Sequence, residues 1–113
     1  MKTTCHCGRI KIEVEPPAQV TSCNCSLCSR YQALWGYYLP SQVAIEVQDG
    51  CERAYTWGDK ELEFVHCANC GCVTHYRTVP GQPDPRIAVN FRMVVGDSVA
   101  GIPVQFFDGK NML

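Results

Sequence analysis

The spacing of the cysteines constrains this chain more than any other feature of its sequence. Most of its nine cysteines stand in three clusters, which are CHCG at residues 5–8, CNCSLC at 23–28 and CANCG at 67–71. Cys51 and Cys72 lie outside these clusters. A chain of 113 residues buries only a modest hydrophobic core, so a covalent or metal cross-link would add much to its stability. The cysteines are the side chains that can supply such a cross-link.

The sequence favours metal binding over disulfide bonds. It starts with MKTTCHCGRI, which lacks the apolar stretch of a signal peptide, and no later run approaches the roughly 18 apolar residues of a membrane helix. We therefore expect a soluble, cytoplasmic protein, in which clustered cysteines are more often metal ligands than disulfide partners. The odd number of cysteines, nine, also fits poorly with a framework built of disulfides alone.

The distribution of charge argues against nucleic acid as the main partner. The formal net charge is -1, and the lysines and arginines are scattered without a basic run. Surfaces that bind nucleic acid instead concentrate cations along a phosphate backbone. We expect neither a nucleic acid nor a membrane as a partner, and the composition leaves the oligomeric state open.

Short segments of alternating or β-branched residues predict a mostly β fold. In residues 9–15, RIKIEVE, the residues Ile10, Ile12 and Val14 share one face and charged residues share the other. Further runs rich in β-branched and aromatic residues are separated by turn sequences such as Asp49-Gly50. These runs are residues 33–39, 43–47, 53–57, 62–67, 73–78, 86–91 and 102–107. We expect a single domain over residues 1–113, made of short antiparallel strands and stapled through its cysteines, with a short helical turn at 26–32 and an exposed loop at 79–85.

The first and third clusters together have the ligands of a structural zinc site. In Cys-x-x-Cys followed by glycine, both sulfurs can turn toward one ion, and the glycine lets backbone N–H groups approach the thiolates. Cys5 and Cys7 with Cys67 and Cys70 would make a four-cysteine site that ties the N-terminus to the middle of the chain. The alternatives are buried, inert cysteines and a redox Cys-x-x-Cys, which is disfavoured because no βαβ pattern surrounds it.

The middle cluster offers three ligands, Cys23, Cys25 and Cys28. An open fourth position is what separates catalytic zinc sites from structural ones. Three thiolates on Zn²⁺ leave a formal charge of about -1, so the ion would activate water poorly but could hold an incoming thiol as a nucleophilic thiolate. We therefore predict a thiol substrate. The alternative is a site closed by a fourth protein ligand. The candidates for that ligand are Cys51, Cys72, His6, His66 and His75.

Taken together, the three clusters resemble those of the glutathione-dependent formaldehyde-activating family, which includes proteins of the centromere protein V type. The resemblance runs through CHCG, CNCSLCSR and HCANCGCVTHY to the closing segments IAVNFRMV and VQFFDGKN. It implies a β-rich, tent-like fold that binds two zinc ions per chain. It also implies a structural zinc on Cys5, Cys7, Cys67 and Cys70, and a catalytic zinc on Cys23, Cys25 and Cys28.

The activity that this resemblance implies is that of a carbon–sulfur lyase or synthase. The namesake reaction joins glutathione and formaldehyde as S-(hydroxymethyl)glutathione, in which the glutathione thiolate attacks the aldehyde carbon. The expected function is therefore zinc-dependent synthesis or cleavage of a small thiol–aldehyde adduct, with Cys23, Cys25 and Cys28 as the catalytic zinc ligands. A non-enzymatic zinc-binding module for a thiol or a protein partner is the alternative. No residue of the sequence stands out as the proton donor.

Two further groups of residues are candidates for a substrate pocket. The stretch LWGYY carries Trp35, Tyr37 and Tyr38, which could wall a pocket beside the second zinc, although packing in a core is the more common role of strand aromatics. Several arginines could pair with the carboxylates of a thiol such as glutathione, although an ordinary surface position is the more common one. These are Arg30, Arg77, Arg86 and Arg92.

Overall fold

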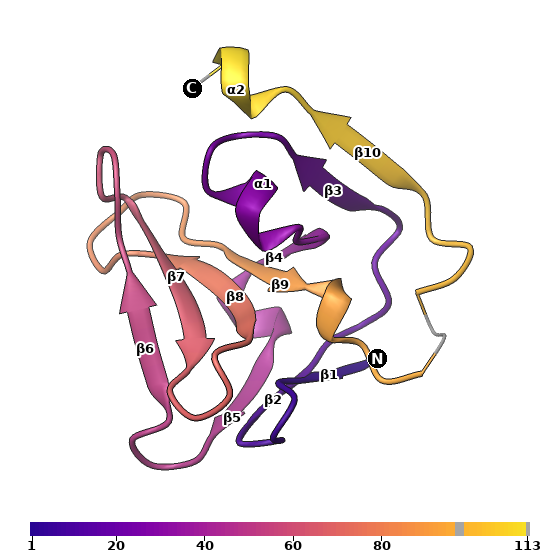
Figure 1. Cartoon of the computed structure of the whole chain (residues 1–113), viewed down its shortest axis with the longest axis vertical. Helices are drawn as coiled ribbons and strands as arrows, with labels where there is room; N and C mark the ends of the chain where they lie inside the picture. The colour runs from indigo at the N-terminus through magenta and orange to yellow at the C-terminus, as the bar shows by residue number, and fades with distance from the viewer. Residues whose placement is uncertain (97–98, 113) are drawn as a thin grey trace.

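The computed structural model describes residues 1–96 and 99–112, and strands make up most of its regular structure (Figure 1). The strands are β1 (Lys2–Thr4), β2 (Ile10–Glu13), β3 (Val20–Cys23), β4 (Trp35–Tyr38), β5 (Ala44–Val47), β6 (Glu52–Tyr55), β7 (Leu62–Cys67), β8 (Val73–Thr78), β9 (Ile87–Asn90) and β10 (Val104–Phe107). The helical elements are α1 (Cys28–Tyr31), α2 (Gly109–Met112) and the 3₁₀ turns η1 (Pro40–Gln42) and η2 (Phe91–Met93). Within the described residues, no helix has the length and apolar character needed to cross a membrane.

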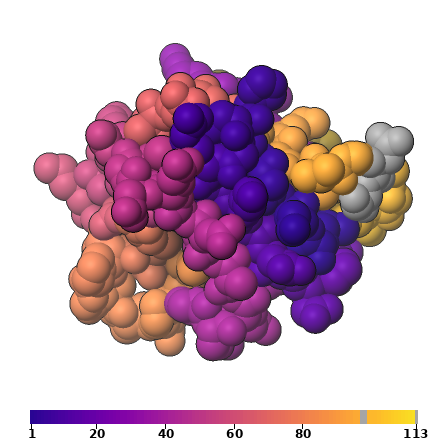
Figure 2. Space-filling model, turned by 90° about the horizontal axis from the view of Figure 1, so that it is seen from below, coloured from indigo at the N-terminus to yellow at the C-terminus, as the bar shows by residue number. Residues whose placement is uncertain are grey.

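The strands form two sheets. The smaller sheet has the order β1-β2-β5, and the larger has the order β10-β3-β4-β9-β8-β7-β6. Neighbouring strands are antiparallel except for β10, which runs parallel to β3. Figure 2 shows the N-terminal residues packed side by side with the segment that contains β5, as the pairing of β2 with β5 requires.

The prediction of a mostly β fold is confirmed, with differences at particular strands. Predicted strands 62–67 and 73–78 coincide with β7 and β8, and the helical turn predicted at 26–32 contains α1. Two short strands, β1 and β3, were not predicted, because KTT and VTSC contain few of the apolar residues that mark a strand. The parallel pairing of β10 with β3 was also not predicted. No hairpin connects these two strands, so no tight turn forces them to be antiparallel.

The alternation in β2 places its apolar residues in the core. Ile10 and Ile12 are fully buried while Lys11 is exposed, and the two isoleucines pack in one cluster with Val89 and Phe91. This arrangement fixes the β1–β2 turn, which carries the first cysteine cluster, against the larger sheet.

Candidate metal centres and substrate cavity

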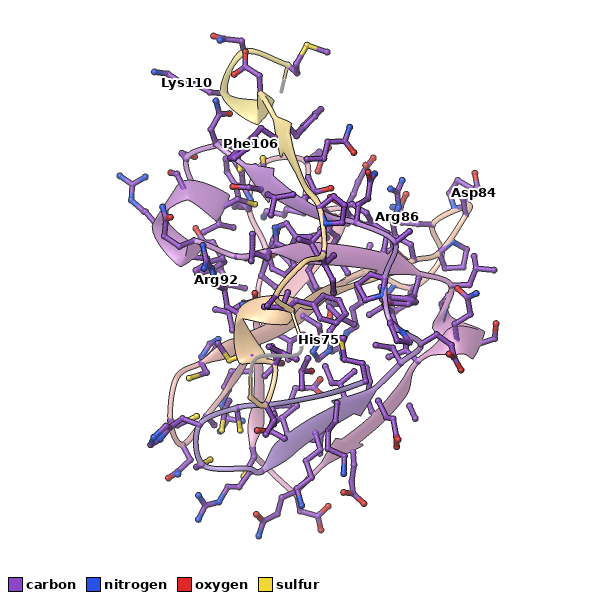
Figure 3. All side chains as sticks on the ribbon, turned by 90° about the vertical axis from the view of Figure 1, so that its right-hand side faces the viewer. His75, Asp84, Arg86, Arg92, Phe106 and Lys110 are labelled. Atoms are coloured by element: carbon purple, nitrogen blue, oxygen red, sulfur yellow. The ribbon has the colours of Figure 1, made fainter. Side chains whose placement is uncertain are left out.

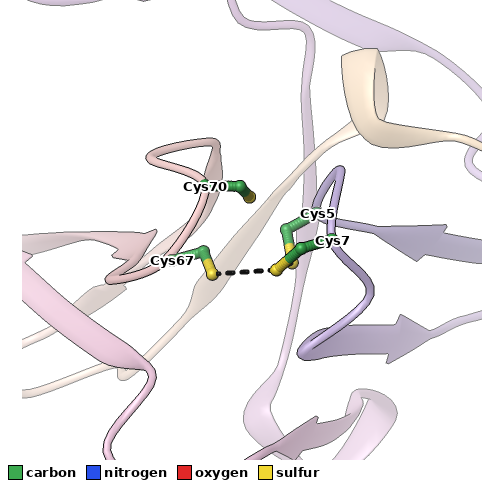
Figure 4. Close-up of side chains that lie close together, drawn as sticks. All are labelled: Cys5, Cys7, Cys67 and Cys70. Carbon is green, nitrogen blue, oxygen red and sulfur yellow. Dashed lines mark hydrogen bonds between the residues drawn. The ribbon is translucent and has the colours of Figure 1, made fainter.

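Four cysteines from distant parts of the sequence meet where the turn between β1 and β2 faces the turn between β7 and β8 (Figure 4). The sulfurs of Cys5, Cys7, Cys67 and Cys70 all lie within 4.8 Å of one another. The Sγ atoms of Cys7 and Cys67 are 3.5 Å apart, and those of Cys5 and Cys7 are 3.7 Å apart. Four sulfurs about 2.3 Å from a tetrahedral zinc would be separated by about 3.8 Å, whereas the sulfurs of a disulfide are about 2.05 Å apart. The cluster therefore has the spacing of metal ligands and could hold an ion.

The turns that carry these cysteines direct backbone N–H groups at the sulfurs. The N–H of Ile10 donates to Cys5 Sγ at 3.3 Å, and the N–H of Asn69 donates to Cys67 Sγ at 3.4 Å. Gly71 closes the second of these turns with a φ of 79°, a conformation that side chains with a Cβ rarely adopt. Such donors stabilise thiolates, so the local backbone supports the deprotonated cysteines that a metal requires.

The electrostatic environments of the two N-terminal cysteines differ. The Asn69 side chain and Arg9 beside Cys7 lower the pKa of its thiol to about 5, whereas burial raises the pKa of the Cys5 thiol to about 11. A buried thiolate without a cation is unfavourable, and a divalent ion would remove this penalty by pairing with it. The site therefore fits a metal better than it fits four unligated thiols.

The second group of cysteines lies where β3 ends and α1 begins. The sulfurs of Cys23, Cys25 and Cys28 lie within 4.8 Å of one another, and among residues 1–96 and 99–112 no further His, Cys, Asp or Glu joins them. The N–H of Cys25 donates to Cys23 Sγ at 3.5 Å, and the N–H of Cys28 donates to Cys25 Sγ at 3.3 Å. Burial raises the pKa of the Cys25 thiol, but hydrogen bonds with the backbone N–H groups of Cys28 and Leu27 and with the side chains of Cys28 and Cys23 outweigh burial and lower the pKa overall. This group could hold a second ion through three thiolates.

The structure places the candidates for a fourth ligand elsewhere. His75 is completely buried, its Nδ1 lies 2.8 Å from Thr74 Oγ1, and burial lowers its pKa to about 4. Cys72 lies beside the four-cysteine cluster, where the backbone of His6 donates to its sulfur. Cys51 pairs through its backbone carbonyl with the N–H of Ala68, at 2.8 Å. His66 stands in β7 opposite Arg53.

The three-cysteine group lies in the wall of a cavity of about 630 Å³. Figure 1 shows α1, which carries one of these cysteines, between the β6–β7 hairpin and the segment formed by β10 and α2. Strands β4, β7, β8 and β10 and the loop between β6 and β7 all contribute side chains to the cavity. More than half of the aromatic residues of the chain line it: Trp35, Tyr37, Trp57, Phe64, Tyr76 and Phe107.

Two of the three aromatic residues singled out in LWGYY face this cavity. Trp35 and Tyr37 line it, whereas Tyr38 donates its hydroxyl to the carbonyl of Glu15 at 2.7 Å and packs near Phe91. This division follows from strand geometry, since residues 35 and 37 point to one face of β4 and residue 38 points to the other. Trp35 is also 1% exposed, so it belongs to the core as well as to the cavity wall.

Four further aromatic residues of the cavity were not found from the sequence. Phe64 lies in β7, Tyr76 in β8, Trp57 in the loop between β6 and β7, and Phe107 at the end of β10. They come from segments distant in sequence, and only the strand pairing of the larger sheet brings them to one place. Nothing in the local sequence marks Tyr76 or Phe107 as a cavity residue. Trp57 had a weak signal, because it is an aromatic residue directly before the turn at Gly58.

The four arginines proposed as carboxylate partners lie outside the cavity wall. Arg77 pairs with Glu52 at 2.7 Å and with Glu63 at 3.0 Å. Arg30 and Arg92 donate to backbone carbonyls, at 2.6 Å and 2.8 Å. Figure 3 shows Arg86 and Arg92 well apart from each other. In this structure, therefore, these arginines do not form a common binding site for carboxylates.

Comparison with known proteins shows which family this chain belongs to and which solved structure it resembles. The family model described as glutathione-dependent formaldehyde-activating enzyme matches residues 1–98. A crystal structure of a Rhodobacter sphaeroides protein, a structural-genomics target, is similar to this chain with a TM-score of 0.73 and 27% sequence identity, and the match covers 93% of this chain and 100% of that one. No functionally curated protein matches the chain. The chain belongs to the glutathione-dependent formaldehyde-activating enzyme family.

Proposed function

We propose that this protein is a zinc-dependent carbon–sulfur lyase or synthase that forms and cleaves the adduct of a small thiol and an aldehyde. The observation that carries the proposal is a group of three cysteines, without a fourth ligand among the described residues, in the wall of an aromatic cavity. Cys5, Cys7, Cys67 and Cys70 would hold a structural zinc that joins two distant turns.

Zinc held by Cys23, Cys25 and Cys28 would have a fourth position for the thiolate sulfur of a substrate. Because the three cysteine thiolates already offset the charge of the ion, the bound substrate sulfur would stay nucleophilic. The N–H groups that point at Cys23 and Cys25 stabilise the negative charge gathered at this place. The buried part of the aromatic wall, formed by Trp35, Phe64 and Tyr76, would remove part of the surface of the reacting groups from water.

The chemistry requires one proton to move for each adduct formed. A C–S bond forms when the thiolate sulfur attacks the aldehyde carbon, and the π pair of the C=O bond becomes an alkoxide that takes a proton. Tyr76 lines the cavity, and burial raises the pKa of its phenol, so it stays protonated at neutral pH and would give up its proton only to a strong base such as this alkoxide. It regains the proton that the thiol releases, so thiol and aldehyde combine without another product. Cleavage is the reverse of these steps.

We also propose a reducing compartment, such as the cytoplasm, as the location of the protein. Seven of the nine cysteines belong to the two candidate metal groups, and clustered cysteines that bind metal rather than form disulfides are typical of such compartments.

The test is exchange NMR of formaldehyde mixed with glutathione, 2-mercaptoethanol or benzyl mercaptan, with and without the zinc-loaded protein. We expect the protein to accelerate exchange between free thiol and adduct for at least one of the three thiols, and Cys25→Ser to abolish the acceleration while the fold remains. Cys51→Ser is the matched control, since Cys51 belongs to neither cysteine group. Unchanged exchange with all three thiols and fully metal-loaded protein would favour the alternative, a non-enzymatic zinc-binding module.

A further inference from the structure

The charges around the cavity differ from those that a glutathione site needs. Glutathione carries two carboxylates and one ammonium group, so a site for it needs cations or N–H donors aimed at both ends. Among the described lining residues, the only Lys, Arg, Asp or Glu side chains are Lys110 and Asp59, and their charges cancel. Both side chains are exposed, and Lys110 lies in α2 at the edge of the molecule (Figure 3). The cavity therefore offers little charge to bind a peptide with two carboxylates and an ammonium group.

The wall next to the cysteines is instead a rigid group of rings. The ring centroids of Trp35 and Tyr76 are 4.8 Å apart, and those of Phe64 and Tyr76 are 5.0 Å apart. These three residues form one buried cluster with Cys25 and Cys28. Rings at such distances and angles hold one another in place, so an apolar surface lies directly beside the sulfurs.

The size of the cavity admits a large apolar group. A cavity of about 150 Å³ is enough to bind benzene, whereas this cavity measures about 630 Å³. An aryl group on the thiol and an aldehyde could both be accommodated. The volume of the cavity therefore does not limit which thiol can enter it. The chemistry of the side chains that line the cavity determines which thiol binds.

We propose that the preferred thiol of this site carries an aryl or bulky alkyl group near its sulfur and at most one carboxylate, and is not glutathione. This inference rests on the proposed function, because it assumes that a thiol sulfur reaches Cys23, Cys25 and Cys28. The apolar group packs against Phe107, which stands opposite Cys23 in the pairing of β10 with β3, and against Trp57. A single carboxylate can reach Lys110.

Two adjacent phenylalanines in β10 provide a matched pair of variants. Phe107 lines the cavity and is 40% exposed, whereas Phe106 does not line it and is 81% exposed. Neither is a metal ligand, and neither is buried enough for its removal to disrupt the core. An apolar substrate group should therefore respond to Phe107→Ala and not to Phe106→Ala.

The experiment is a titration of the zinc-loaded full chain with benzyl mercaptan, 2-mercaptoethanol or glutathione, followed by tryptophan fluorescence. Both tryptophans of the chain, Trp35 and Trp57, line the cavity, so their emission reports its occupancy. We expect benzyl mercaptan to bind about tenfold or more tightly than either other thiol, since burial of one aromatic ring has at least that effect. Phe107→Ala should weaken benzyl mercaptan about fivefold or more by the same burial argument, and should leave the binding of 2-mercaptoethanol unchanged.

The outcomes separate this inference from the proposed function. Glutathione binding as tightly as benzyl mercaptan, or more tightly, would overturn the inference and leave the proposed function standing. Equal effects of Phe107→Ala and Phe106→Ala would also overturn it, because the apolar group would then lie outside the cavity. Binding of none of the three thiols to zinc-loaded protein would overturn the inference and the proposed function together.

Discussion

The double variant Cys67→Ser/Cys70→Ser removes both ligands that the β7–β8 turn gives to the four-cysteine site and should destabilise the whole fold. The contact between Cys7 and Cys67 closes a loop of 60 residues. A cross-link across such a loop lowers the entropy of the unfolded chain by an amount worth about 4 kcal/mol at 25 °C, on the chain-entropy model used for disulfides. Because small domains have total stabilities of about 5–15 kcal/mol, we expect the double variant to lose a large part of its free energy of unfolding.

The assay is urea unfolding of metal-loaded protein followed by circular dichroism. Cys72→Ser is the control, since Cys72 is also partly buried and lies next to the site but outside the ligand group. Cys23→Ser is a second comparison, because its group spans only residues 23–28 and the same model gives a cross-link worth about 2 kcal/mol. Equal losses of stability in Cys67→Ser/Cys70→Ser and in Cys72→Ser would refute the assignment of the structural site.

Three other predictions concern single residues. A Cβ at residue 36 would overlap the fully buried ring of Phe91, so Gly36→Ala should lower the free energy of unfolding in urea by about 1–3 kcal/mol; an unchanged midpoint would contradict this packing. Tyr76→Phe should slow adduct exchange about 100-fold in the NMR assay, the usual effect of losing a proton donor, but leave the thiol Kd unchanged because the ring remains. Burial lowers the pKa of His75 from 6.5 to about 4. Between pH 6.5 and pH 4 the unfolded state therefore binds more protons than the folded state, and the free energy of unfolding falls as the pH falls through this range. The expected loss is about 3 kcal/mol, and urea midpoints across this range should fall less steeply in His75→Asn.

The grouping of the cysteines could be predicted because each half of a site is local in sequence. Cys5 and Cys7, like Cys67 and Cys70, are separated by one or two residues and stand in turns, so each pair directs its sulfurs to one place whatever the rest of the chain does. In the structure these four cysteines lie together, because the β1–β2 turn faces the β7–β8 turn.

The cavity could be predicted only in part because its wall depends on long-range strand pairing. Trp35 and Tyr37 follow from the alternation in one strand near the second cysteine group. Phe107 reaches the cavity because β10 pairs in parallel with β3, in a register that sets it opposite Cys23. Nothing in the local sequence VQFF specifies that partner or that direction, so this part of the site needed the structure.

X-ray absorption at the zinc edge, with metal analysis, tests the central claim most directly, namely that one site is closed by four cysteines and the other is open. We expect two zinc ions per chain and about 3.5 sulfur ligands per zinc, the mean of four and three. Addition of a thiol that binds should raise this average to about 4 in the native protein, and leave it unchanged in Cys25→Ser. An average of about 4 before any thiol is added, or a single zinc per chain, would contradict the account.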